Sequence, residues 1–186
     1  MIDGAVRLLA QKGLQGTSFS EVLELTGAPR GSIYHHFPGG KDELVVAAVR
    51  TAGARTDAYL EQVRGAPPAA VAAHFLEAWR VLLLRGGFAI GCSVTAVAVA
   101  AESVTLLDAA AAVFREWRAQ LAELLRTAGV ETGRADAFAV TLIAASEGAV
   151  VMSRAARSIE PFETVAAQFA EQARGLAAEG SRPAGH

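Results

Sequence analysis

Hydrophobic residues recur at intervals of three and four along nearly the whole chain, and this spacing is typical of helices with one buried face. Alternating patterns of the kind that favour strands are not evident. Glycine and proline breaks separate the hydrophobic runs into nine predicted helices. Their approximate bounds are residues 2–12, 18–27, 29–37, 41–64, 68–85, 93–101, 106–127, 132–157 and 161–178. The pattern predicts an all-α fold.

A short helix is predicted between two sets of backbone breakers. Gly27 suits the end of the preceding helix, where a residue with positive φ is common. Pro29 suits the first turn of the next helix, and the Pro-Gly-Gly sequence at 38–40 ends it. Ile33 and Phe37 are four residues apart and share one face. We expect that face to anchor the helix in a small core.

The other face of this short helix carries small and hydrogen-bonding residues: Arg30, Gly31, Ser32, Tyr34 and His35. They offer donors and acceptors and, at Gly31, almost no bulk. A surface that enters the major groove of duplex DNA needs these properties, because phosphates and base edges are contacted by hydrogen bonds at close range. These residues are therefore candidate DNA contacts.

The preceding predicted helix begins with a capping pattern. Ser18 and Glu21 are three residues apart, so the Ser18 hydroxyl can accept from the Glu21 N–H. Two successive helices of this kind can dock as a helix-turn-helix, in which the first helix crosses the DNA backbone. Free N–H groups at its start would then face a phosphate, and Thr17 and Ser18 are candidate contacts there. Lys41, at the start of the next predicted helix, is a further phosphate candidate.

These segments closely resemble the DNA-binding region of the TetR family of transcriptional regulators. Residues 2–13 fit the family's opening helix, residues 16–19 its turn into the second helix, and residues 27–44 its recognition helix. The His-Phe-Pro-Gly-Gly-Lys form is similar to a subgroup of lincomycin-resistance and multidrug-efflux repressors. The resemblance implies a three-helix, helix-turn-helix DNA-binding domain (1–45), a larger helical effector-binding and dimerisation domain (46–180), and a disordered tail (181–186).

The resemblance also implies a homodimer formed through the last two long helices. Small residues flatten the middle of the predicted helix 132–157: Ala144, Ala145, Ser146, Gly148 and Ala149. A flat face allows two helix backbones to approach closely, and a twofold dimer presents two heads to half-sites about 34–36 Å apart. An alternative is that this helix lies at the centre of the monomer core.

In the TetR family the fifth, seventh and eighth helices enclose an effector cavity, and the resemblance implies such a cavity here. Aromatic residues of these segments, with three polar residues, are candidate ligand contacts: Phe75, Trp79, Phe88, Cys92, Phe114, Trp117, Phe138, Thr141 and Glu147. Ligand cavities are mostly apolar with a few polar anchors, so we expect a small hydrophobic effector. Each aromatic residue taken singly is compatible with core packing, and Glu147 with an ion pair to Arg154.

Composition indicates the cellular compartment and argues against some binding modes. The net charge of −2 and pI near 6.1 argue against nonspecific coating of nucleic acid. Residues 1–55 carry six basic and five acidic side chains, net +1, which leaves −3 for the remainder. The single cysteine excludes an internal disulfide and fits a reducing compartment. The longest apolar run, 88–101, is shorter than a membrane helix requires, so we expect a cytoplasmic protein without a membrane segment.

No motif predicts an enzyme, a cofactor or a metal site. The Gly-Gly-Lys sequence at 39–41 resembles the end of a phosphate-binding loop, but His35 and Asp42 stand where glycine and Ser or Thr are needed. Adjacent His35 and His36 point about 100° apart on a helix and lack partners at ligand spacing. Two further pairs have no spacing that brings them together for catalysis: Cys92 with His74, and Asp136 with Glu147.

The sequence therefore predicts a ligand-responsive DNA-binding transcriptional regulator, a repressor released from operator DNA by a small hydrophobic effector. Two alternatives remain open. One is an all-helical ligand-binding or enzymatic protein that no longer reads DNA, and the other is an interaction protein that acts through its dimer surface. One departure from the family pattern favours both alternatives. Family members often carry a basic extension before the first helix, and only Met1 precedes Ile2 here.

Overall fold

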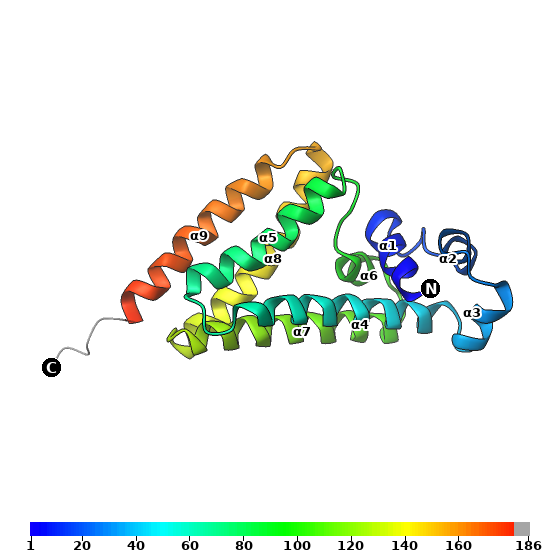
Figure 1. The fold of residues 1–186 in the computed structure, drawn as a ribbon, viewed down its shortest axis with the longest axis horizontal. Helices are drawn as coiled ribbons and strands as arrows, with labels where there is room; N and C mark the ends of the chain where they lie inside the picture. Colours follow the sequence, from blue (N-terminus) through cyan, green and yellow to red (C-terminus); the bar gives the residue numbers. More distant parts are fainter. Residues whose placement is uncertain (181–186) are drawn as a thin grey trace. The chain divides into compact units, whose positions relative to one another are not determined.

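The computed structural model describes residues 1–180, and the secondary structure of this part is entirely helical (Figure 1). In chain order the helices are α1 (Ile2–Lys12), α2 (Phe19–Thr26), α3 (Arg30–His36), α4 (Lys41–Leu60), the 3-10 helix η1 (Glu61–Val63), α5 (Pro68–Arg85), α6 (Ser93–Ala100), α7 (Val104–Thr127), α8 (Thr132–Ala156) and α9 (Glu160–Gly180). The all-α prediction is confirmed. The predicted disordered tail, residues 181–186, lies outside the described residues.

Most predicted helix bounds agree with the structure to within a few residues. α1 and α5 have the predicted bounds. α4 ends at Leu60, so the predicted last turn of this helix is the separate 3-10 helix η1. α7 begins earlier than predicted, at Val104. α8 ends at Ala156 because Arg157 adopts a left-handed conformation with a φ of 50°.

The chain forms two compact units, each assembled from separate stretches of sequence. The first contains residues 1–56 and 91–115, so α6 and the first half of α7 join the N-terminal helices. α6 packs against α1, and the Gly91 N–H donates to the Ala10 carbonyl at 2.9 Å. A Cβ added at Gly53 would lie 2.9 Å from Val113, so α4 and α7 approach closely there. The predicted division near residue 45 follows sequence order, whereas these units follow packing.

The second unit contains residues 57–90 and the chain from Glu116 onward, and α5, α8 and α9 pack against one another in it. Arg80 on α5 makes a two-point ion pair with Glu163 on α9, with N–O distances of 2.6 and 2.9 Å. These hydrogen bonds raise the pKa of Arg80 and lower the pKa of Glu163. The guanidinium carbon also lies 5.9 Å from the centre of the Phe162 ring. One arginine therefore links α5 to the start of α9.

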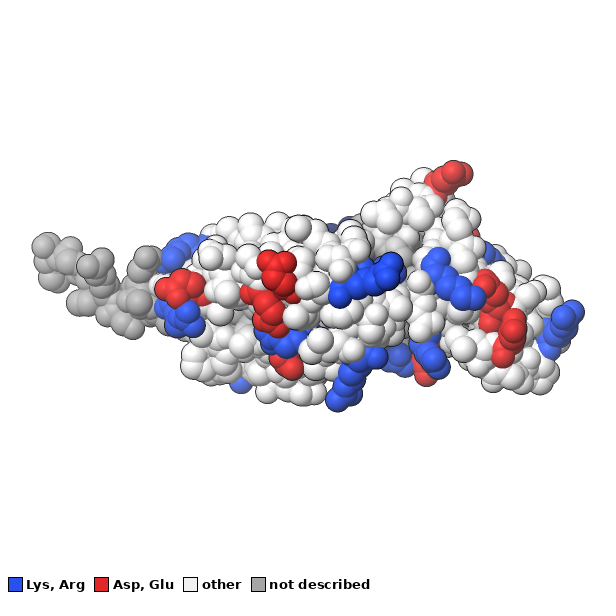
Figure 2. Space-filling model, turned by 90° about the horizontal axis from the view of Figure 1, so that it is seen from above, with Lys and Arg blue, Asp and Glu red and all other residues white. Residues whose placement is uncertain are grey.

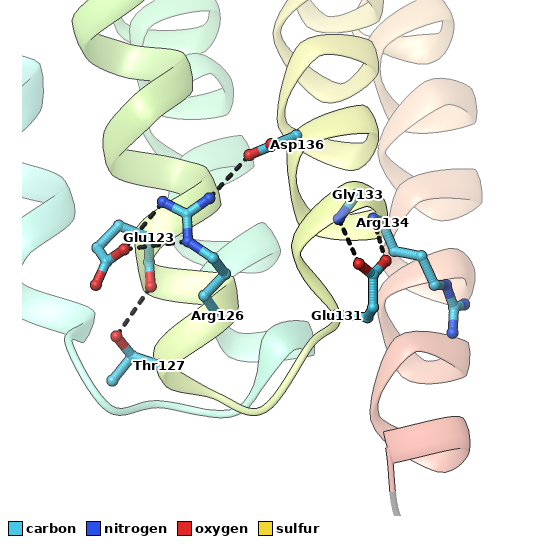
Figure 3. Close-up of polar contacts among 7 residues, drawn as sticks. All are labelled: Glu123, Arg126, Thr127, Glu131, Gly133, Arg134 and Asp136. Atoms are coloured by element: carbon cyan, nitrogen blue, oxygen red, sulfur yellow. Dashed lines mark hydrogen bonds and ion pairs between the residues drawn. The ribbon is translucent and has the colours of Figure 1, made fainter.

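Charged side chains hold the turn between α7 and α8 (Figure 3). Arg126 donates within α7 and, at 2.8 Å, to Asp136 on α8. The Glu131 carboxylate accepts from the N–H groups of Gly133 and Arg134 at 2.8 and 3.0 Å, which lowers the pKa of Glu131. Asp136 therefore has a structural partner in this turn, and Glu131 caps the N-terminus of α8.

By length and composition alone, α8 is apolar enough to cross a membrane, with a mean hydropathy of 1.5 over its most apolar window. The core helix of a soluble protein has the same properties, and 44% of this window is buried. The sequence prediction considered only the longest apolar run, 88–101, and did not consider this helix. On the face shown in Figure 2, acidic and basic side chains are interspersed, in keeping with the small net charge.

Candidate nucleic-acid interface

Local hydrogen bonds position α2 and α3, which are joined by a tight turn. The Ser18 hydroxyl accepts from the Glu21 N–H at 3.2 Å, so Ser18 caps α2 as the pattern predicted. α2 ends at Gly27, whose φ of 67° lets its N–H donate to the Leu23 carbonyl at 2.8 Å. Pro29 is the N-cap of α3 rather than its first helical residue. The chain therefore turns between the two helices at the glycine that the sequence indicated.

An ion pair ties the end of α1 to the start of α2. Lys12 Nζ lies 2.8 Å from one carboxylate oxygen of Glu21, and the other oxygen accepts from the Ser18 hydroxyl at 3.3 Å. The hydrogen bond between Lys12 and Glu21 lowers the pKa of Glu21 and raises the pKa of Lys12. In the same three helices, fully buried side chains form a small core: Leu9, Val22 and Ile33. Capping, pairing and burial thus make the three helices a defined platform.

α3 buries one face and exposes the other, as predicted. Ile33 is fully buried and Phe37 is 7% exposed. The residues predicted to contact DNA are exposed or partly exposed: Arg30, Gly31, Ser32, Tyr34 and His35. The structure therefore brings these five residues to the outward side of one helix, on which they are available to a partner.

A contact with α2 positions the Tyr34 side chain. Its ring meets the Phe19 ring edge-on, with centroids 5.5 Å apart and planes at 80°, and the side chain remains 66% exposed. The rings of His35 and His36 are also 5.5 Å apart, and both residues are exposed. Among residues 1–176, whose side chains the structure describes, no group of three His, Cys, Asp or Glu side chains is arranged to hold a metal ion.

Two predicted phosphate contacts already have partners within the fold. Thr17 is buried, and its hydroxyl donates to the Gly13 carbonyl at 2.8 Å. Lys41 Nζ donates to the Leu14 carbonyl at 2.8 Å, which ties the start of α4 to the loop between α1 and α2. An ammonium has three N–H donors, so Lys41 keeps two for another acceptor. The buried Thr17 hydroxyl instead supports the turn.

Two glycines of this platform differ in their surroundings. A Cβ added at Gly31 would meet no atom within 4 Å, so the free protein does not require glycine at this position of α3. A Cβ at Gly4 would lie 2.5 Å from the methyl carbon of Thr26, so the contact between α1 and α2 does require glycine. Any requirement for glycine at Gly31 must therefore come from a partner.

The predicted ligand contacts divide between the two units. Cys92 and Phe114 belong to the first unit, and the other seven belong to the second. Phe75 and Trp79 are buried on α5, and their rings meet edge-on with centroids 6.3 Å apart. Phe138 instead meets a phenylalanine ring of α9 at 5.6 Å. The aromatic residues of the second unit thus take part in at least two separate ring contacts.

The three predicted polar ligand contacts also differ from one another. Cys92 caps α6 by accepting a backbone N–H at 3.4 Å. Thr141 is exposed, and its hydroxyl donates to the carbonyl one turn earlier at 2.9 Å. Glu147 is partly buried, and Arg154, its suggested ion-pair partner, donates to the Ala89 carbonyl at 3.3 Å. Cys92 and Thr141 therefore each bond a backbone group close in sequence.

The sequence analysis placed Ser146 and Ala149 on the flat small-residue face suggested for a dimer contact, but the structure buries both inside the single chain, so this part of the prediction is wrong. Ser146 is fully buried, and its hydroxyl has no hydrogen-bond partner among the described residues. Leu142, Ala149 and Ser153 are buried on the same helix at spacings of four, three and seven. This spacing was the available signal that Ser146 faces inward.

Comparisons with known proteins agree with the geometry of the platform. Residues 1–48 match the family of bacterial regulatory proteins, tetR family, and residues 68–168 match the LmrA/YxaF-like transcriptional regulator C-terminal domain. An uncharacterized HTH-type transcriptional regulator of Mycobacterium tuberculosis is 33% identical over 176 residues, which cover 91% of this chain and 90% of that protein. The HTH-type transcriptional regulator LmrA of Bacillus subtilis is 26% identical, over 87% of this chain and 88% of LmrA.

Solved structures share the fold. The regulatory protein TetR from Rhodobacter sphaeroides superposes with a TM-score of 0.81 at 23% identity, over 91% of this chain and 95% of that one. A TetR transcriptional regulator from Legionella pneumophila gives a TM-score of 0.82 at 20% identity, over 92% and 94%. The family matches and the full-length relatives together show that the chain belongs to the TetR family of DNA-binding transcriptional regulators, with a C-terminal domain of the LmrA/YxaF type.

Proposed function

We propose that this regulator is a repressor that releases operator DNA when a small, largely hydrophobic effector binds its C-terminal part. A relative supports the repressor role: the HTH-type transcriptional repressor AcnR of Corynebacterium glutamicum is 40% identical over 55 residues, or 30% of this chain. The effector acts by shifting a population, so it must bind the released form more tightly than the DNA-bound form. We assign DNA binding to residues 1–45 and effector binding and dimerisation to residues 46–180, with the cytoplasm as the place of action.

The exposed face of α3 is the observation that carries the proposal. Helical residues are 100° apart, so Arg30, Tyr34, Gly31 and His35 follow one another around less than half of the helix. Ile33, on the other side, holds the helix in its core. Arginine can bond two acceptors of guanine at once, and the tyrosine and histidine side chains can bond bases or phosphates. This face has the composition and accessibility of a groove-reading surface.

Phosphate contacts flank this face in the proposed complex. Ser18 caps α2, and the first N–H groups of that helix favour an anion. Lys41 stands at the start of α4 with donors left for a phosphate. Thr17 contributes indirectly, by bonding the Gly13 carbonyl and holding the turn in place.

The proposed dimer forms through α8 and α9. From Ala137 onward, exposed residues of α8 that are small or apolar recur at helical spacing: Ala137, Thr141, Ala144, Gly148, Val151, Met152 and Ala155. Such a surface lets a second copy approach closely, and an interface between identical surfaces has twofold symmetry. A twofold dimer carries two copies of α3, which suits a palindromic operator with half-sites about 34–36 Å apart.

Operator binding by α3 variants tests the proposal. Genomic fragments bound by the wild type supply the operator, and gel-shift titration at fixed salt measures affinity. We expect Arg30→Ala and Tyr34→Phe each to weaken operator binding about tenfold, the effect of one lost base contact, with unchanged circular dichroism. Tyr34→Phe keeps the ring contact with Phe19, so it isolates the hydroxyl. Arg85→Ala, at the exposed end of α5, is the control. Wild-type affinity in both α3 variants would contradict the assignment.

A further inference from the structure

Among the buried side-chain polar atoms of the second unit without a hydrogen-bond partner within the described residues, two belong to residues that are more than nine-tenths buried. They are the indole N–H of Trp79 on α5 and the hydroxyl of Ser146 on α8. Trp79 is 8% exposed and Ser146 is fully buried. Buried polar groups are nearly always hydrogen-bonded, because leaving one unpaired forfeits its bonds to water. Both groups therefore require an explanation.

The two residues lie on helices that pack together. α5 and α8 run beside each other in the same direction within the second unit (Figure 1). Arg154, in the last turn of α8, donates to the Ala89 carbonyl just after α5, so the same ends of the two helices meet. Trp79 and Ser146 both lie in the half of their helix that leads to this end. The Phe75 ring beside Trp79 adds an apolar surface.

Ser153, on the same helix, is a buried serine with a structural role. It lies seven residues after Ser146, on the same helical face, and it is also fully buried. Its hydroxyl accepts from the Phe162 N–H at 3.1 Å and so holds the start of α9. Ser146 has no such role, although its burial is the same. Ser153 is therefore a structural serine, whereas the Ser146 hydroxyl is available to bond a ligand.

We propose that Trp79 and Ser146 are the polar anchors of the effector site, and that the effector is a mostly apolar molecule without a negative charge that carries a hydrogen-bond acceptor such as a carbonyl oxygen. The proposal rests on the effector-binding part of the proposed function. An indole N–H can only donate and a hydroxyl can donate, so both groups suit one acceptor-bearing ligand. Thr141, whose hydroxyl bonds its own helix, is not an anchor.

The charge of the effector follows from the buried residues around it. Among residues with described side chains, the buried polar ones are Thr17, Ser93, Ser146 and Ser153, and none carries a positive charge. The buried side-chain oxygens of Asp57 and Glu147 belong to carboxylates of partly buried residues. A buried ionic ligand without a counter-charge is strongly disfavoured. The partly buried carboxylate of Glu147, next to Ser146, further disfavours an anion. These surroundings therefore favour an effector that carries no negative charge.

Two probes that differ in one heavy atom test the proposal. Acetophenone carries a carbonyl oxygen where α-methylstyrene has a methylene carbon, so the pair isolates the acceptor at equal size. Isothermal titration calorimetry measures both affinities. We expect the wild type and Ser153→Ala to bind acetophenone at least about tenfold more tightly than α-methylstyrene, because a site built to hydrogen-bond discriminates against an analogue lacking the bond. Ser146→Ala and Trp79→Phe are expected to lose most of this preference.

The stability of the empty protein provides a second readout. We expect Ser146→Ala to keep or raise the Tm, because it removes a buried group without a partner. Ser153→Ala is expected to lower the Tm, because it leaves the Phe162 N–H unpaired. Equal affinity for the two probes, no binding of either, or a Tm loss in Ser146→Ala like that of Ser153→Ala would overturn the proposal. A failure of the proposed regulatory function would give a different result: the unliganded wild type would show no specific operator binding.

Discussion

At the scale of single residues, glycine is needed at Gly4 and at Gly31 for different reasons: packing within the fold at Gly4, and a proposed partner at Gly31. Gly4 allows α1 to touch Thr26 at the end of α2, and a larger residue would collide there. Gly31 touches nothing, yet it lies at the centre of the exposed face of α3. A residue without a Cβ lets the helix backbone come closest to a ligand. Packing thus explains the first glycine, and DNA binding is the proposed reason for the second.

Gly31→Ala is expected to leave stability unchanged or to raise it by up to about 1 kcal/mol, because alanine favours helices. The same change is expected to weaken operator binding, because its methyl group would stand between α3 and the DNA. Thermal unfolding and gel-shift titration measure the two effects. Gly4→Ala is the matched control and is expected to lower the unfolding free energy by about 1–3 kcal/mol through overpacking. Undiminished operator affinity in Gly31→Ala would remove this residue from the contact surface.

Arg80 and Glu163 give the second unit a pH-dependent link. Hydrogen bonds from Arg80 hold the pKa of Glu163 below its ordinary value of 4.5. A lowered folded-state pKa stabilises the protein above the unfolded-state value, and the contribution is lost as the pH falls through the folded-state pKa. Glu163→Gln should therefore be less stable than the wild type at neutral pH, by at most about 1 kcal/mol for a partly exposed pair. Urea unfolding across the acid range should show this difference shrinking below pH 4.5; a difference independent of pH would exclude this pair as its source.

At the scale of elements, α3 depends on its neighbours for its position. Its seven residues are too few for a stable isolated helix. The cap at Ser18, the turn at Gly27 and the buried Ile33 hold it against α1 and α2. α4 is joined to the same platform because Lys41 bonds the Leu14 carbonyl. The proposed reading surface therefore depends on the set of helices and not on α3 alone.

Lys41→Met tests the link between α4 and the DNA backbone. Loss of one phosphate contact is expected to weaken binding to all sequences alike and to reduce the salt dependence of log K by about one unit. Stability should fall by about 1 kcal/mol, because the Leu14 carbonyl loses its donor. Binding titrations over a range of salt concentrations measure the slope, with the exposed α7 variant Arg118→Ala as control. An unchanged slope in Lys41→Met would leave Lys41 with its structural role only.

At the scale of the whole molecule, the proposed regulator works as a pair, because one α3 reads only half of a palindrome. Ala144→Arg would place a charge in the middle of the exposed small-residue surface of α8. We expect it to give a folded monomer with reduced operator affinity. Light scattering and circular dichroism measure assembly and folding, and Ala119→Arg, exposed on α7, should remain dimeric. If Ala144→Arg also stays dimeric, the interface lies on another surface.

Sequence alone determined the helices and the outward face of α3, because these depend on contacts between residues a few positions apart. The capping of α2 by Ser18, the turn at Gly27 and the burial of Ile33 and Phe37 all followed from local spacing. The N-terminal motif also led to the family. These features were predictable because backbone hydrogen bonds and helical periodicity act over short stretches of chain.

Only the tertiary structure decided which polar groups are already bonded and which segments form one unit. Sequence spacing could not reveal that Lys41 bonds the Leu14 carbonyl 27 residues away, or that α6 packs on α1. It also could not distinguish Ser146 from Ser153, two buried serines on one helical face, since only Ser153 meets the N–H of Phe162 at the start of α9. Whether a buried group is satisfied depends on atoms that packing brings from distant parts of the chain.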